Sequence, residues 1–243
     1  MQLPAKHPYL NLVFPAPPSE RPYVGLNMVM SVDGKITVGG QLKAGSLGSP
    51  FDRYTMSVLR HHFGAVICGG ETIRRHPYYL GVSPELIPFR KARGMASQPL
   101  TVIVTNSGNL PYPAPLFEGA ERPIILTSQA SFQRVTQSLG PVAEVHAVGE
   151  QRVEVREALA FLREHYRISR LLLEGGPRLN YQFFKERAVD EVFLTIAPRL
   201  VGSVSDLTMV MGEDVLENLP RLELISHFQR DNELFLRYQV PRN

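Results

Sequence analysis

The sequence has no tryptophan and only one cysteine, Cys68, among its 243 residues. A single cysteine excludes an internal disulfide and is typical of a protein from a reducing compartment. No stretch approaches eighteen consecutive apolar residues, and no apolar run of signal-peptide length follows Lys6. The sequence therefore indicates no membrane span, and we expect a cytoplasmic protein with Cys68 in its core.

Several binding signatures are also missing. Basic residues never form a run longer than three, so the formal charge of +3 gives little support for nucleic-acid binding. Histidine and cysteine do not occur at metal-ligand spacing, and neither a P-loop nor a Gly-x-Gly-x-x-Gly fingerprint is present. We expect no metal, and the mild positive charge favours an anionic small molecule.

The composition is that of a folded globular protein, with 44% apolar and 20% charged residues. The length permits one large domain or two small ones, and we expect a single domain over residues 21–243. Five prolines precede it, so residues 1–20 are predicted to form an extended arm that lies on the domain.

Apolar runs alternate with segments of helical periodicity. The pattern predicts an α/β fold with a mostly parallel central sheet, followed by an antiparallel C-terminal hairpin that turns at residues 231–232. Loops rich in glycine, proline and serine are expected at 39–50, 78–98 and 106–121. The predicted strands are 23–30, 65–68, 100–105, 123–127, 142–148, 170–173, 191–197, 222–230 and 233–240, and the predicted helices are 52–62, 131–139, 153–166 and 178–187.

The segment 171–177, Leu-Leu-Leu-Glu-Gly-Gly-Pro, is the most informative part of the sequence. An apolar strand runs into Glu174, Gly175 and Gly176 just before a helix, and such a junction directs backbone N–H groups at an anion. A carboxylate at the end of a buried strand needs a partner, which is either a ligand or a structural group such as loop amides or an arginine.

A second junction, Ala-Val-Ile-Cys-Gly-Gly-Glu-Thr at 65–72, repeats this plan about a hundred residues earlier. Gly69 and Gly70 permit close approach of a ligand to the backbone, and Thr72 provides a donor in the first helical turn. A tight turn without a ligand explains the pattern equally well. Together, the two junctions suggest one long ligand, such as a dinucleotide, that spans two strand ends.

The first strand leads into Ser31, Asp33, Gly34 and Lys35, which place a hydroxyl, a carboxylate and an ammonium at the edge where open α/β sheets bind ligands. The alternative is a solvated turn in which Gly34 adopts a positive φ.

Four ordered motifs resemble the reductase domain of bifunctional riboflavin-biosynthesis enzymes, here without an attached deaminase. They are Ser-Val-Asp-Gly-Lys-Ile at 31–36, Gly-Gly-Glu-Thr-Ile-Arg at 69–74, Glu-Gly-Gly at 174–176 and Ala-Pro-Arg-Leu-Val-Gly at 197–202. The resemblance covers residues 21–240. It implies a dihydrofolate-reductase-like fold with three layers and a homodimer paired through the terminal strands.

The resemblance also implies an activity: reduction of 5-amino-6-(5-phosphoribosylamino)uracil to its ribitylamino product by NADPH, with hydride delivered to the sugar C1. This chemistry requires a nicotinamide held about 3 to 3.5 Å from that carbon, a proton for the imine nitrogen and donors for the substrate phosphate.

By the same resemblance, the candidate catalytic residues are Lys35, Glu174 and Asp33, and the substrate-binding residues are Ser31, Lys35 and Glu174. The next strand end, at Thr105, Asn106 and Ser107, is where family members approach the adenosine 2′-phosphate. The cofactor-binding residues implied in total are Gly69, Gly70, Thr72, Thr105, Ser107, Gly175, Gly176 and Leu179.

One departure from the family pattern leaves alternatives open. Family members typically continue after the threonine motif with Ala-Asp-Asp-Pro or Ala-Asp-Asn-Pro, whereas this chain has Arg74, Arg75 and His76 before a proline. The change either preserves anion binding or indicates another substrate, such as a different heterocycle or a pterin. A non-catalytic NADP-binding protein is the third possibility, although the presence of Lys35 and Glu174 argues against it.

Overall fold

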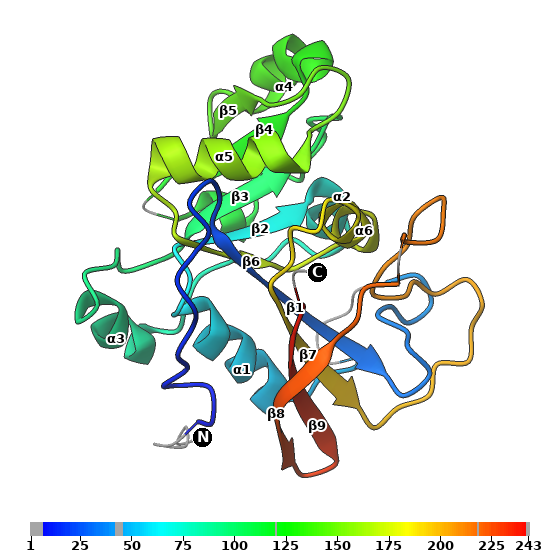
Figure 1. The fold of residues 1–243 in the computed structure, drawn as a ribbon. Coiled ribbons are helices and arrows are strands. Elements are labelled where there is room, and N and C mark those ends of the chain that lie inside the picture. The colour runs from blue at the N-terminus through cyan, green and yellow to red at the C-terminus, as the bar shows by residue number, and fades with distance from the viewer. Residues whose placement is uncertain (1–6, 42–45, 120, 218, 242–243) are drawn as a thin grey trace.

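A nine-stranded sheet forms the centre of the protein (Figure 1). The computed structural model describes residues 7–41, 46–119, 121–217 and 219–241, so the first six residues of the expected arm and part of the 39–50 loop lie outside the described residues. The strand order is β5-β4-β3-β2-β6-β1-β7-β9-β8. The strands are β1 Tyr23–Ser31, β2 Ala65–Gly69, β3 Leu100–Val104, β4 Ile124–Thr127, β5 Glu144–Ala147, β6 Arg170–Leu173, β7 Glu191–Ala197, β8 Glu223–Arg230 and β9 Glu233–Gln239.

Strands β1 to β7 pair in parallel, and the last two strands form an antiparallel hairpin. Strand β9 pairs antiparallel with β7, which joins the hairpin to the parallel part of the sheet. Asp231, with a φ of 52°, lies at the predicted turn. The predicted α/β class, the parallel sheet and the terminal hairpin are confirmed.

The predicted helices are present within a few residues of the expected bounds. One helix and two of the 3₁₀ turns lie in segments that the sequence indicated only as loops. The helices are α1 Pro50–Arg60, α2 Gly70–Arg75, α3 Ile87–Lys91, α4 Phe132–Leu139, α5 Val155–Tyr166 and α6 Pro177–Lys185, with 3₁₀ turns at Pro84–Leu86, Pro115–Phe117 and Gln129–Ser131.

Helix α3 is held by tertiary contacts rather than by its own sequence. It is five residues long and contains Pro88, so it has little helical stability alone. Its Arg90 side chain is only 1% exposed and donates to the carbonyls of Phe63, at 2.8 Å, and Arg60, at 3.2 Å. These bonds satisfy carbonyls at and just beyond the end of α1, and they fix α3 beside it.

Two apolar layers cover the two faces of the sheet. Strand β6 shows how the sheet separates them: Leu172 belongs to the layer with α1 and α4, whereas Leu171 and Leu173 belong to the layer with α5 and α6. This arrangement gives the expected three-layer architecture. Cys68 is fully buried in the first layer, and burial raises the pKa of its thiol.

The described part of the expected N-terminal arm packs against the α1 side of the sheet. Tyr9 and Phe14 are buried there, and the His7 ring is hydrogen-bonded to the Thr55 hydroxyl at 2.8 Å. The division of the chain into an arm and one domain stays a prediction. None of the helices in the described residues is long and apolar enough to cross a membrane.

The short length of β6 creates an opening in the sheet. Residues Tyr23 to Leu26 of β1 pair with β6, but the remainder of β1, from Asn27, pairs only with β7. The chain leaves the sheet at Glu174 and turns into α6. The second half of β1 is therefore unpaired on the side that faces β2, at the carboxyl edge of the parallel strands, where ligands bind in such sheets.

Candidate active site

This opening leads into a cavity of about 920 Å³ between α1, α2, α6 and the ends of β2, β3 and β6. Both glycine junctions contribute to its lining, so they open on one shared space rather than on opposite sides of the sheet. The sequence-predicted residues that line it are Gly69, Gly70, Thr72, Thr105, Ser107, Glu174, Gly176 and Leu179.

The two junctions also contact each other directly. The Gly69 N–H donates to the Gly175 carbonyl at 2.7 Å, and a Cβ added at Gly176 would lie 2.9 Å from the Thr72 Oγ1. Gly175 has a φ of +85°, a conformation that favours glycine, and its peptide bond to Gly176 is cis. A side chain at Gly176 would thus occupy the narrow space between β6 and α2.

The N-terminus of α6 faces the cavity without a side-chain cap. Gly176 is its N-cap residue and Pro177 has no N–H, so the first backbone donors of the helix are those of Arg178 and Leu179. These N–H groups have no partner within the helix. Together with the helix dipole, they make this end of the cavity suitable for an anion.

Glu174 is paired with an arginine rather than left open. Arg60 of α1 donates to both of its carboxylate oxygens, at 2.8 and 2.7 Å, and the Tyr78 hydroxyl donates to Oε2 at 3.3 Å. Burial, followed by the nearby Glu174 charge, raises the pKa of Tyr78 well above its ordinary value, so its hydroxyl remains a donor. The structural partner foreseen for this carboxylate is present, and the role of Glu174 in catalysis stays a prediction.

Ser31, Asp33 and Lys35 are absent from the residues that line the cavity. Asp33 accepts from the Ser31 hydroxyl at 2.5 Å and from the backbone N–H of Val201 and Gly202 at 3.1 and 2.7 Å. These bonds lower the pKa of Asp33 to about 2. They also attach the loop after β1 to the segment after β7.

Lys35 belongs to the same connection between the two segments. Its Nζ donates to the Asp206 carbonyl at 3.1 Å, and its backbone bridges to Thr208. Gly34 has a φ of +78°, as expected for a turn. The proposed catalytic and substrate-binding roles of Ser31, Asp33 and Lys35 stay predictions, since the observed contacts are structural.

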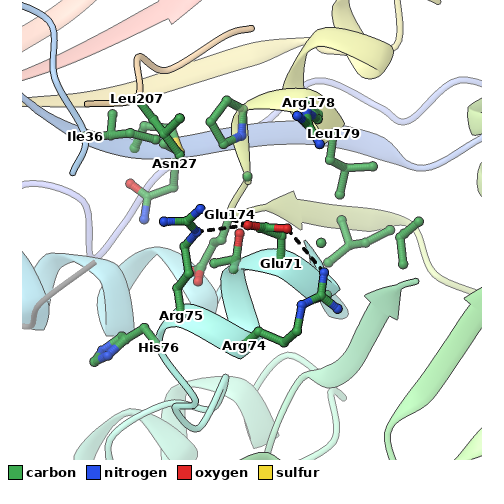
Figure 2. A pocket seen from close by; sticks show the side chains of 18 of the residues that line it. Asn27, Ile36, Glu71, Arg74, Arg75, His76, Glu174, Arg178, Leu179 and Leu207 are labelled. Carbon is green, nitrogen blue, oxygen red and sulfur yellow. Dashed lines mark hydrogen bonds and ion pairs between the residues drawn. The ribbon is translucent and has the colours of Figure 1, made fainter. Parts of the chain in front are cut away.

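The Arg74, Arg75 and His76 segment, where the sequence departs from the family pattern, lies on the cavity wall. Figure 2 shows Arg74 and Arg75 extending from α2 with ion pairs to Glu71, at 3.3 and 2.9 Å. Arg74 also donates to the Ser107 hydroxyl at 3.1 Å. The end of β3 therefore combines a guanidinium with hydroxyl donors.

The cavity is strongly basic. Its lining contains six arginines and three carboxylates. Two of these carboxylates, Glu71 and Glu174, already form ion pairs with arginines. A ligand with several negative charges fits this distribution. The arginines are Arg53, Arg60, Arg74, Arg75, Arg152 and Arg178.

Asp52 and Arg60, both on α1, are among the side chains of the cavity wall that were not predicted from the sequence. Asp52 is 7% exposed, and burial raises its pKa to about 6. An acidic residue in the first turn of a helix usually compensates the helix dipole, so its sequence position does not mark Asp52 as a site residue. Their spacing of eight residues, which places two side chains on roughly one face of a helix, was the available signal.

Comparison with known proteins identifies the family. Residues 22–236 match the family described as the RibD C-terminal domain. This chain belongs to that family. The expectation drawn from its four motifs is confirmed.

Individual relatives agree with this assignment. A 2,5-diamino-6-ribosylamino-4(3H)-pyrimidinone 5′-phosphate reductase of Aquifex aeolicus is 33% identical over 91% of this chain and 97% of its own. The structure of a pyrimidine reductase-like protein from Corynebacterium diphtheriae superposes with a TM-score of 0.79 at 24% identity, over 91% of this chain and 93% of that chain. An Enterococcus faecalis dihydrofolate reductase, at a TM-score of 0.50 and 12% identity over 90% of this chain and 97% of that chain, shares the fold.

Proposed function

We propose that this protein is an NADPH-dependent reductase of the riboflavin pathway that acts on a 5′-phosphorylated ribosylaminopyrimidine. The substrate expected from the sequence is 5-amino-6-(5-phosphoribosylamino)uracil, and the Aquifex aeolicus relative is named for the corresponding 2,5-diaminopyrimidinone. The observation that carries the proposal is the convergence of the two glycine junctions on one basic cavity.

The residues present fit a dinucleotide cofactor. The contact between Gly69 and Gly175 brings the two strand ends together, and the missing side chain at Gly176 leaves room beside Thr72. Phosphate groups at this position would accept from the free N–H groups of the first turn of α6, including that of Leu179. The bound cofactor supplies the hydride, and the protein orients its phosphates.

The polar end of β3 favours NADPH over NADH. A 2′-phosphate needs donors and positive charge, and Arg74, Ser107 and Thr105 provide both at one place on the cavity wall. Arg152 lines the same cavity and adds positive charge to it. NADH carries a hydroxyl at that position, so the electrostatic gain would be lost.

The substrate is proposed to occupy the part of the cavity between α1 and the unpaired half of β1. Asn27 and Glu174 line this part, and the bond from Arg60 holds the carboxylate in a fixed orientation. The proposed role of Glu174 is to position the sugar through its remaining acceptor capacity.

A direct assay tests the proposal. Purified protein is mixed with NADPH and one of the two phosphoribosylaminopyrimidines, the uracil or the 2,5-diaminopyrimidinone. The absorbance of NADPH is followed at single turnover and at steady state. A separate reaction contains dihydrofolate as the alternative substrate. We expect oxidation of NADPH with a phosphoribosylaminopyrimidine and none with dihydrofolate. NADPH binding without turnover of any substrate would instead support a non-catalytic binding protein.

We further propose a cytoplasmic homodimer that pairs through the C-terminal hairpin. Strand β8 forms one edge of the sheet, and Leu224 and Ile225 on it are 52% and 44% exposed. An uncovered edge strand that exposes apolar side chains is a site of association. Light scattering should give twice the monomer mass, and replacement of Ile225 with lysine should reduce it to the monomer mass.

A further inference from the structure

Asp52 is a buried carboxylate that lines the cavity and has no role in the proposed cofactor site. It lies in the first turn of α1, on the wall that also carries Met56 and Arg60. Eight residues of helix separate the backbones of Asp52 and Arg60 by about 12 Å along the α1 axis. Asp52 lies at the N-terminal end of α1, whereas the residue that pairs with Glu174 lies at its C-terminal end.

The partners of these two carboxylates differ sharply. Asp52 and Glu174 are each only 7% exposed. Glu174 is paired through the bidentate contact with Arg60, whereas Asp52 forms no ion pair within the described part of the chain. Interaction with the Thr195 side chain only partly offsets the rise in the pKa of Asp52 that burial causes. A carboxylate has about four lone-pair sites, so most of the acceptor capacity of Asp52 is unused.

The surroundings keep the Asp52 carboxylate in place. A Cβ at Gly48 would lie 2.0 Å from Oδ2, so the absence of a side chain at that residue is what makes room for it. The charge of Glu233 adds to the rise in the pKa of Asp52, and Glu233 itself accepts from the Ser49 backbone N–H and hydroxyl at 2.7 and 2.6 Å. Such a buried acceptor is costly unless a ligand provides donors.

We propose that Asp52, oriented by Thr195, recognises the substrate pyrimidine through two parallel hydrogen bonds to adjacent N–H donors, and so selects the 2-amino ring over the uracil ring. This inference rests on the proposed function. The 2,5-diaminopyrimidinone presents N3–H beside a 2-amino group, a pair of donors that matches a carboxylate. The uracil presents N3–H between two carbonyls, one of which would face a carboxylate oxygen without a donor.

The proposal predicts a reversal when the carboxylate becomes an amide. In the Asp52→Asn variant, the amide oxygen accepts from N3–H and the amide nitrogen donates to the C2 carbonyl, which complements the uracil. The ratio of kcat/KM for the 2,5-diaminopyrimidinone phosphate to that for the uracil phosphate should exceed ten in the wild type. It should fall by roughly ten- to a hundredfold in the variant, the range for a bidentate contact.

Two further variants separate recognition from general damage. Thr195→Val removes the orienting hydroxyl and should lower kcat/KM for the 2-amino substrate without improving the uracil. Asp231→Asn makes the same chemical change at an exposed turn, where Asp231 has 87% of its side chain exposed, and should leave the ratio unchanged. Circular dichroism melting confirms that each variant is folded.

Binding of two ring analogues, which lack the sugar and the 5-amino group, distinguishes failure of this inference from failure of the proposed function. Isothermal titration with 2,6-diaminopyrimidin-4-one and 6-aminouracil should show a preference of at least tenfold for the former, removed by Asp52→Asn. If both phosphorylated substrates are reduced with a ratio that Asp52→Asn does not change, the recognition role is wrong and the proposed function stands. If neither is reduced, the proposed function is wrong, and the titration alone tests the recognition role of Asp52. A tenfold preference for 2,6-diaminopyrimidin-4-one that Asp52→Asn removes would support that role. Equal binding of the two rings would overturn it.

Discussion

Removal of Arg60 should be among the most destabilising single changes to the cavity wall. Arg60→Met keeps most of the aliphatic volume but deletes the guanidinium that binds both oxygens of Glu174 and also donates to the Tyr79 and Gly81 carbonyls. The exposed fractions of the Arg60 and Glu174 side chains are 6% and 4%, so the carboxylate would remain buried without a cation. Such a loss costs about 3–5 kcal/mol, or about 6–20 °C in Tm for a chain of this length.

Urea unfolding monitored by circular dichroism measures this cost. Arg156→Met is the matched control. Arg156 forms an ion pair with Glu186 at 2.8 Å, but its side chain is 77% exposed, so loss of this ion pair should cost less than 1 kcal/mol. Adding Glu174→Gln to Arg60→Met should restore part of the stability, because the buried charge is then absent. A loss no larger than that of the control would refute the reasoning.

Two further predictions concern the cofactor and pH. Arg74→Gln should raise the Kd for NADPH about tenfold and leave the Kd for NADH within about twofold, as measured by fluorescence titration; equal effects on both cofactors would contradict the assignment of the 2′-phosphate. Burial lowers the pKa of His61 to about 4 and of His62 to about 2, so both rings are neutral when folded and take up protons on unfolding below about pH 6.5. The free energy of unfolding should therefore fall from pH 7 to pH 4, by up to about 1.4 kcal/mol per pH unit for each proton, and a flat profile in urea melts would contradict this.

Much of the fold follows from local sequence patterns. The parallel strands are apolar runs such as 170–173, whose two faces are both covered, and the hairpin turn at 231–232 is a short-range signal. Helix α3 was missed because five residues contain too little periodicity, and its position depends on Arg90 and on carbonyls about 30 residues away in the chain.

The candidate site was predictable only in the part that is formed by the backbone. The glycine junctions at 69–70 and 175–176 were recognisable because glycine and helix starts are local features. The direction of the Asp33 and Lys35 side chains was not, because their partners come from the segment after β7, about 170 residues later. The pairing of Glu174 with Arg60 spans 114 residues, beyond the reach of any spacing rule.

The central claim is that the two glycine junctions together hold one reduced nicotinamide cofactor. Titration of NADPH with the Gly176→Val variant tests it most directly, with Gly119→Val as the control, since a Cβ at Gly119 makes only ordinary contact, at 3.5 Å from the Tyr79 ring. We predict that Gly176→Val, with an unchanged circular dichroism spectrum, loses NADPH binding while the control retains it. Wild-type affinity for NADPH in folded Gly176→Val protein would contradict the account.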